Sequence, residues 1–295
     1  MSQLRLAVIL NPHSNRQRAA HQASHIMAML SHFGLEASLF KTTHVGHATS
    51  LAQQCVAEGT WDGIIAAGGD GTINEIVNGM AGSQLPLSFV PLGTGNDFVK
   101  MLKLPANSIV EAIRAIANNQ LRQIDLGIIN QHWFINGVGI GLDANVAIEA
   151  QKLKHIKGGL VYMIAVLKSI LRYEARDLLI ETDDLTLQQR INMATVGNGG
   201  YHGGGFWVTP AAKIDDGLLD VCLTGEQSRW SMVRDSARVR QGTHGDLPSV
   251  TMLKTRTFKL HSERGVPVHV DGEVFSASLH DITISIQPAA LTIRV

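Results

Sequence analysis

The sequence has few cysteines, few charged residues and no excess of either charge. Its 295 residues include two cysteines, and 25 Lys plus Arg balance 25 Asp plus Glu, so the formal net charge at pH 7 is zero. A chain without excess positive charge lacks the field that attracts polyanions, so no nucleic-acid partner is expected. Cys55 and Cys222 lie far apart without a metal-binding spacing, which favours a reducing compartment and a cytoplasmic location.

Long apolar runs are also missing. The run from Leu6 to Leu10 is too short for the core of a signal peptide. The uncharged run from Gly158 to Leu167 has about half the length that a membrane-spanning helix needs. We therefore expect no membrane-spanning segment. Glycine, in contrast, is abundant at 29 residues, and much of it lies in predicted loops.

Short apolar segments alternate with helical periodicity over the first 120 residues. Strands are predicted at 5–10, 35–41, 63–67 and 86–91, with helices at 46–58, at 73–80 and from Ser108. This alternation predicts a parallel sheet with helices on both faces. From about Asp125 the pattern changes to alternating β-branched runs with glycine turns, which predict strands that include 132–138, 273–277 and 282–286. The predicted fold is an α/β domain at 1–124 and a β-rich sandwich at 125–286, with the segment of about 287–295 packing back on the first domain.

Four loops follow the strands that we expect in the first domain. They are Asn11–Asn15, Thr42–Gly46, Gly68–Thr72 and Pro91–Asp97. The carboxyl ends of parallel strands meet at one edge of a sheet, where open α/β sheets bind ligands. Glycines, hydroxyl groups and helix N-termini at this edge predict a site for nucleotide phosphates. Neither GxxxxGK[ST] nor GxGxxG is present, and one glycine cluster alone is also explained as a tight turn before a helix.

Five motifs in this order resemble the diacylglycerol kinase catalytic-domain family, and especially its bacterial soluble lipid kinases. They are NPHS at 11–14, GGDGTINE at 68–75, PLGTGNDF at 91–98, DDGLLDV at 215–221 and VDGE at 270–273. Sphingosine and ceramide kinases, and more distantly NAD kinases, are similar in the glycine loop. The resemblance implies transfer of the γ-phosphoryl group of ATP to a lipid hydroxyl, of diacylglycerol or a related lipid, with Mg²⁺.

The resemblance also implies roles for individual residues. The nucleotide-binding residues would be Asn11, Ser14, Thr42, Gly68, Gly69, Asp70, Gly71, Thr72, Ile73, Asn74 and Thr94. The metal ligands would be the Asp216 carboxylate and the backbone carbonyls of Lys213 and Leu218, with Asp125 joining through water. From spacing alone, Asp216-Gly217 is equally explained as a hairpin turn. Asn15 stands where the family commonly has glycine, and asparagine tolerates a positive φ.

Two carboxylates are candidates for the proton acceptor. Resemblance to the bacterial kinases favours Glu273, whereas the sphingosine-kinase relatives favour Asp70, which otherwise orients the glycine loop. Spacing alone explains Asp271-Gly272, just before Glu273, as a hairpin turn. We expect Glu273 to be the base, so that Glu273→Gln abolishes turnover and leaves ATP binding nearly intact.

Alternatives to a lipid kinase stay open at this point. One is an NAD kinase-like transferase for a soluble hydroxyl, and another is a non-catalytic nucleotide sensor, which the presence of Asp70, Asp216 and Glu273 disfavours. Basic residues at 152, 154, 155 and 157 precede the apolar run, a composition that fits an interfacial helix or, more simply, a solvated lead-in to a core helix. We expect transient, peripheral contact with the inner membrane face. Which lipid is phosphorylated and whether the chain forms a homodimer stay open.

Overall fold

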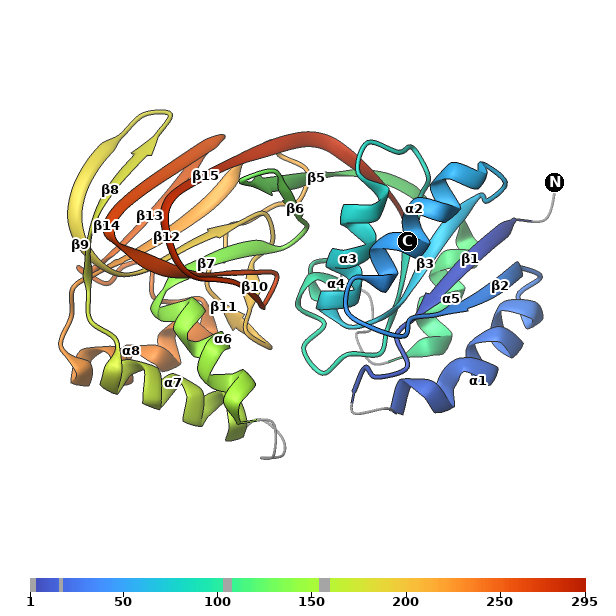
Figure 1. The fold of residues 1–295 in the computed structure, drawn as a ribbon, viewed down its shortest axis with the longest axis horizontal. Helices are drawn as coiled ribbons and strands as arrows, with labels where there is room; N and C mark the ends of the chain where they lie inside the picture. The colour runs from blue at the N-terminus through green and yellow to red at the C-terminus, as the bar shows by residue number, and fades with distance from the viewer. Residues whose placement is uncertain (1–3, 16–17, 103–107, 154–159) are drawn as a thin grey trace. The chain divides into compact units, whose positions relative to one another are not determined.

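The chain folds into two compact units (Figure 1). The computed structural model describes residues 4–15, 18–102, 108–153 and 160–295. The first unit comprises Met1–Leu126 and Pro288–Val295, and the second comprises Gly127–Gln287. The chain therefore passes from one unit to the other twice.

Unit 1 is an α/β unit with a parallel sheet. Its strands are β1 (Arg5–Leu10), β2 (Glu36–Lys41), β3 (Gly63–Gly68) and β4 (Leu87–Pro91), and its helices are α1 (Arg18–His32), α2 (His47–Glu58), α3 (Asp70–Met80), α4 (Asp97–Met101) and α5 (Ile109–Asn118). The strands run in the order β2-β1-β3-β4, and each neighbouring pair is parallel. Every residue of β3 and β4 is buried, as expected for strands covered on both faces.

The end of the chain belongs to unit 1. Ile293 pairs in parallel with Leu87 of β4. The Arg294 guanidinium donates to the Asn119 side chain and to the Asp62 carbonyl oxygen, both at 2.8 Å. These contacts fix the last strand beside the sheet of the first unit.

Unit 2 is β-rich and mainly antiparallel. Its strands include β6 (His132–Phe134), β7 (Gly137–Gly141), β8 (Arg176–Thr182), β9 (Thr186–Gly197), β10 (Tyr201–His202), β11 (Phe206–Trp207), β12 (Leu219–Gly225), β13 (Val250–Thr255) and β14 (Thr257–Val270). Two further strands, β5 (Leu121–Ile129) and β15 (Glu273–Arg294), each have residues in both units. Alternating apolar side chains of these strands form one core cluster, which includes Val196, Val221 and Phe258. The two architectures confirm the predicted fold class.

Three helices gather on one side of the unit 2 strands (Figure 1). They are α6 (Leu142–Lys152), α7 (Leu160–Arg172) and α8 (Arg229–Gln241). Helix α7 packs against both α6 and α8. Within the parts of the chain that the structure describes, no helix is both long and apolar enough to cross a membrane.

The structure corrects several element boundaries. Helix α3 begins at Asp70 and not at Ile73, so most of the predicted glycine loop forms the first helical turn. The strand expected across 132–138 is interrupted between β6 and β7. The helix start at Ser108 is confirmed, because its hydroxyl accepts the Glu111 N–H at 3.2 Å. The strands expected at 273–277 and 282–286 form one long strand, β15.

Candidate active site

The first loop of unit 1 is tied to the start of α3 by Asn11. Its side-chain amide donates to the Thr72 hydroxyl at 3.1 Å, and its carbonyl oxygen accepts the His13 N–H at 3.0 Å. The Ser14 N–H donates to the Asn11 backbone oxygen at 3.2 Å. Asn15 has a φ of 50°, so asparagine takes the left-handed conformation at the position where glycine is common. The loop is therefore a fixed turn beside the glycine-rich segment.

The two glycine loops cross in backbone contact. The Leu92 N–H donates to the Gly68 carbonyl oxygen at 2.8 Å. A Cβ atom placed on Gly93 would lie 2.6 Å from the Cα atom of Gly69, closer than such atoms can approach. Glycine is thus required at this crossing because the two backbones touch there. The contact brings the predicted segments Gly68–Asn74 and Pro91–Asp97 together, with Thr94 exposed at the surface.

Asp70 links the same two loops through its side chain. The residue is half-buried in the first turn of α3, and its Oδ1 atom accepts the Phe98 N–H at 3.4 Å. Phe98 lies in the first turn of α4, where a carboxylate is favoured by the helix dipole. Neighbouring Asp97 is buried and pairs with the Lys100 ammonium at 2.7 Å. These contacts give Asp70 a role in orienting the second glycine loop.

The start of α2 is occupied by a side chain that the sequence reasoning missed. Both carboxylate oxygens of Glu75 accept N–H groups there, from Gly46 at 2.9 Å and from Ala48 at 3.1 Å. Because Glu75 accepts the Gly46 and Ala48 N–H groups, these two donors at the start of α2 are not available to a phosphate group in this structure. Thr42, at the end of β2, is buried, and its N–H donates to the Leu10 carbonyl oxygen at 2.9 Å. The Glu75 signal was present in GGDGTINE, but its partner lies 29 residues away.

A polar cavity of about 280 Å³ opens beside the glycine crossing. Its lining includes Asn15, Arg18 and Gln22 from the first loop and α1, together with Gly93 and Ile109. Arg18 is exposed, so it brings a positive charge to a site that adjoins two of the predicted nucleotide loops. A polar lining with a positive charge favours an anionic ligand.

In unit 2, Glu273 follows a turn that is fixed by Asp271. Asp271 and Gly272 have φ values of 48° and 86°, and Val270 pairs with Glu273, as in a two-residue hairpin of type I′. The Asp271 carboxylate accepts the N–H groups of Ile135, Asn136 and Gly137 at 3.0, 2.9 and 2.8 Å. Asp271 is buried and Glu273 is exposed. The turn therefore presents Glu273 at the surface on a rigid support.

A buried ion pair lies next to this turn. The His269 Nε2 atom is 3.2 Å from Asp143 Oδ2, which also accepts the Thr195 hydroxyl at 3.1 Å. A Cβ atom on Gly139 would lie 2.1 Å from His269 Nε2, so only glycine leaves room for the pair. The Gly272 backbone nitrogen lies 3.3 Å from the other ring nitrogen, Nδ1. His269 thus connects Asp143 to the turn that carries Glu273.

Burial and charge act in opposite directions on this pair. Burial disfavours the charged imidazolium and would lower the pKa of His269. The attraction and the hydrogen bond of the Asp143 carboxylate are together the larger effect and raise the pKa of His269 above its ordinary value. Burial likewise disfavours the charged carboxylate and would raise the pKa of Asp143. The attraction and the hydrogen bond of His269 are together the larger effect and lower the pKa of Asp143. The charged form of the pair is therefore favoured between the two pKa values.

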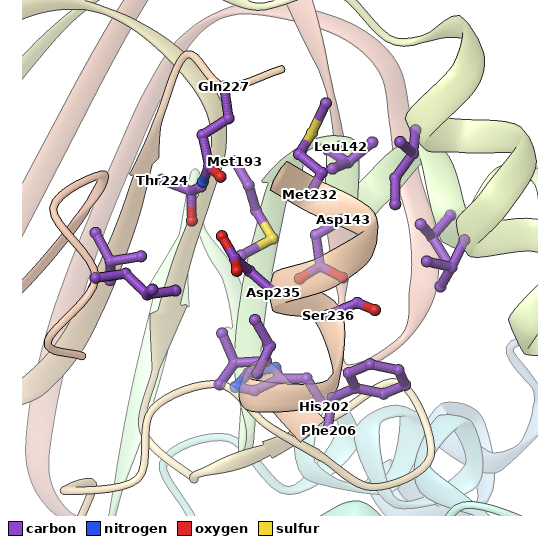
Figure 2. A pocket seen from close by; sticks show the side chains of 17 residues that line it. Leu142, Asp143, Met193, His202, Phe206, Thr224, Gln227, Met232, Asp235 and Ser236 are labelled. Atoms are coloured by element: carbon purple, nitrogen blue, oxygen red, sulfur yellow. The ribbon is translucent and has the colours of Figure 1, made fainter. Parts of the chain in front are cut away.

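Asp143 also lines an apolar cavity in unit 2, of about 100 Å³ (Figure 2). Its walls come from α6, α7 and α8 and from the strands beneath them, with side chains such as Val166, Ile170, Met193 and Phe206. Its polar lining includes the buried side chains of Asp143, His202 and Asp235. A cavity of this volume and lining has room for a small apolar group.

The predicted metal ligands lie on the segment that leads into β12. The Asp216 Oδ1 atom accepts the Leu218 N–H at 3.1 Å, and Oδ2 lies 2.9 Å from the Lys254 ammonium. This carboxylate already holds a cation, so the arrangement does not fit a divalent ion at the same oxygen. Within the described segments, no group of three acidic, histidine or cysteine residues has the spacing of a metal site. The set of Lys213, Asp216 and Leu218 stays a prediction.

Asp125, expected to join the metal through water, lies in unit 1. It is buried, and its Oδ1 atom accepts the Ala289 N–H at 2.8 Å. This bond fixes the segment that precedes the last strand. Asp125 therefore has a structural contact that the sequence did not reveal.

Comparison with known proteins identifies the family. Residues 5–129 match the diacylglycerol kinase catalytic domain, and residues 136–295 match the YegS C-terminal NAD kinase beta sandwich-like domain. A diacylglycerol kinase of Staphylococcus saprophyticus is 31% identical over 272 residues, which cover 91% of this chain and 88% of that protein. The chain belongs to the diacylglycerol kinase family. It is accordingly a kinase.

Other members of the diacylglycerol kinase family agree with this result. The diacylglycerol kinase of Bacillus subtilis is 29% identical over 272 residues, which cover 91% of this chain and 89% of that protein. The crystal structure of a diacylglycerol kinase from Bacillus anthracis has the same fold, with a TM-score of 0.77 and 24% identity, and covers 100% of this chain and 97% of that one. The resemblance that the five motifs predicted is confirmed.

Proposed function

We propose that this kinase transfers the γ-phosphoryl group of ATP, bound as its Mg²⁺ complex, to the hydroxyl group of a lipid of the diacylglycerol class. The match of residues 5–129 to the diacylglycerol kinase catalytic domain carries this proposal. The apolar lining of the unit 2 cavity, which a soluble acceptor such as NAD does not need, agrees with a lipid acceptor. The names of the curated relatives support the same acceptor class.

The nucleotide is assigned to unit 1. The proposed contacts come from the predicted residues on the edge formed by β1, β2, β3 and β4, namely Asn11, Ser14, Thr42, Gly68–Asn74 and Thr94. The crossing at Gly69 and Gly93 lets backbone N–H groups approach phosphate oxygens closely. The adjacent cavity with Arg18 and Gln22 offers room for the rest of the nucleotide. Mg²⁺ enters as part of this substrate and offsets the charge of the phosphates.

Glu273 is the proposed proton acceptor. Its carboxylate takes the proton from the lipid hydroxyl as the hydroxyl oxygen forms a bond to the γ-phosphorus, and the bond from that phosphorus to the bridging oxygen breaks. The products are the phosphorylated lipid and ADP. Asp271 supports this assignment, because its three N–H contacts hold the turn rigid while Glu273 stays exposed. Asp70 has the separate role of orienting the second glycine loop.

The lipid acceptor implies contact with a membrane surface. Helix α7 exposes Met163, Leu167 and Leu171, which are spaced four residues apart and therefore lie on one helix face. Exposed apolar residues in such a row are suited to shallow insertion at the interface of a bilayer. Of the basic residues assigned to this contact, Lys152 is described, whereas positions 154, 155 and 157 lie outside the described residues. We propose reversible peripheral docking through this face of α7.

A phosphorylation assay tests the proposed function. The chain is incubated with γ-labelled ATP and Mg²⁺ together with a total lipid extract or with NAD, and the labelled product is identified. A labelled lipid is expected; labelled NADP, or no labelled product, would contradict the proposal. Glu273→Gln should abolish lipid labelling and leave the affinity for ATP nearly unchanged. Glu263→Gln, at an exposed position on β14, is the matched control and should keep full activity.

A further inference from the structure

Lys254 places its ammonium group between two carboxylates. The Nζ atom lies 2.9 Å from Asp216 Oδ2 and 2.9 Å from Asp220 Oδ2. It is also 3.5 Å from the backbone oxygen of Ala211. An ammonium group has three donors, and each of them has an acceptor here.

The strand register fixes this position. Lys254 of β13 is the direct cross-strand partner of Asp220 of β12, so its side chain emerges beside that carboxylate. Asp216 lies at the end of the turn just before β12, and its other oxygen, Oδ1, accepts the Leu218 N–H. The ammonium group is thus brought to Asp216 by pairing of two strands and not by a chance contact at the surface.

Burial makes a positive charge necessary at this place. The Asp220 side chain is only 5% exposed, while those of Asp216 and Lys254 are 24% and 35% exposed. Two carboxylates so close to each other need a cation, because one of them is almost completely removed from water.

We propose that the Lys254 ammonium is a built-in cation of this chain, which occupies the Asp216 carboxylate and competes with a divalent ion for it. A divalent ion at Asp216 would have to displace the ammonium from Oδ2 and would repel it at short range. The pair of carboxylates with Lys254 carries one net negative charge, whereas without Lys254 it carries two. Removing the ammonium therefore converts the pair into a better site for a hard divalent ion.

The variant Lys254→Met tests this proposal in the absence of nucleotide. Methionine keeps the long apolar stem and removes the charge. Thermal unfolding is measured in EDTA and in millimolar Mg²⁺ or Ca²⁺, and binding of each ion is measured by calorimetry. Lys254→Met should be less stable than the native chain in EDTA, should regain stability with either ion, and should bind Ca²⁺ at least about tenfold more tightly than the native chain, a ratio equivalent to about 1.4 kcal/mol.

Controls separate this effect from general destabilisation. Lys259→Met removes an exposed lysine from β14 and should not change ion binding. Adding Asp216→Asn to Lys254→Met should remove the gained affinity. Equal Ca²⁺ affinity in the native chain and in Lys254→Met would overturn the proposal. If Lys254→Met does not fold, the melting temperature of the native chain with and without Mg²⁺ or Ca²⁺ decides. A rise with either ion that Asp216→Asn abolishes would overturn the proposal, whereas no rise supports the proposal.

Discussion

Replacing Asp271 with asparagine would remove one charge and one acceptor atom from the turn that carries Glu273, with almost no change in size. In the native chain, Oδ1 accepts the N–H groups of Asn136 and Gly137, and Oδ2 accepts the N–H group of Ile135. Asparagine has one carbonyl oxygen and one NH₂ group, so at least one backbone N–H group would face another donor.

The cost follows from these three bonds. If the amide oxygen takes the place of Oδ1, two bonds persist without charge assistance, each weaker by about 1 kcal/mol. The buried N–H group of Ile135 loses its acceptor, which costs about 1–3 kcal/mol. The free energy of unfolding of unit 2 should therefore fall by about 3–5 kcal/mol. For a domain of this size, that loss lowers the melting temperature by roughly 6–20 °C.

Urea unfolding followed by tryptophan fluorescence measures this change. Three of the four tryptophans, Trp133, Trp207 and Trp230, lie in unit 2, so the signal reports mainly on that unit. Asp183→Asn is the matched control, because the exposed Asp183 carboxylate accepts the Arg256 N–H at 2.6 Å at another turn. Water can replace that acceptor, so a smaller loss is expected. Equal losses for the two variants, or no loss for Asp271→Asn, would refute the argument from burial.

Two further predictions concern unit 2. Relative to the double variant Asp143→Asn/His269→Gln, the native chain should be most stable between about pH 4 and 6.5. Because the pKa of His269 is raised, its contribution to stability is lost as pH rises through that pKa. Because the pKa of Asp143 is lowered, its contribution is lost as pH falls through that pKa. Urea unfolding from acid to alkaline pH measures the difference in free energy of unfolding between the two proteins, and a difference that does not change with pH contradicts the charged pair. Changing Leu167 and Leu171 to Glu should weaken binding to phosphatidylglycerol vesicles by about tenfold or more, since each buried leucine contributes roughly 1.5 kcal/mol. A vesicle sedimentation assay measures this binding. The control Leu185→Glu changes an exposed leucine outside α7 and should bind like the native chain in that assay.

Local patterns predicted most of the secondary structure of unit 1. Apolar runs placed β1 and β3 almost to the residue, and the hydroxyl of Ser108 marked the start of α5. The start of α3 was missed because Gly69 at its N-cap has no side chain to signal it, so GGDGT gave the appearance of a loop. In unit 2 the periodicity located strands but not their continuity, because register shifts between β14 and β15 interrupt the alternation while both strands continue.

Motifs revealed those site residues that lie close together in the chain. The contacts that organise the site join distant segments instead. Asp271 reaches the N–H groups of residues 135–137, and Lys254 reaches a carboxylate 38 residues earlier. Such contacts depend on which strands pair and in which register, and neither is encoded in a short motif. A single sequence therefore identified candidate ligands but not the side chains that position or compete with them.

The two Asp-Gly dipeptides show why the structural and the functional explanations of a turn are not exclusive. At Asp271-Gly272 both residues have a positive φ, as the hairpin explanation requires, and the Asp271 carboxylate accepts three backbone N–H groups. That structural role leaves Glu273, the residue after this turn, exposed and rigidly placed, as a proton acceptor at this position requires. At Asp216-Gly217 only the glycine has a positive φ, and the carboxylate faces the ammonium that β13 supplies. The same dipeptide thus has different chemistry because a different strand lies opposite it.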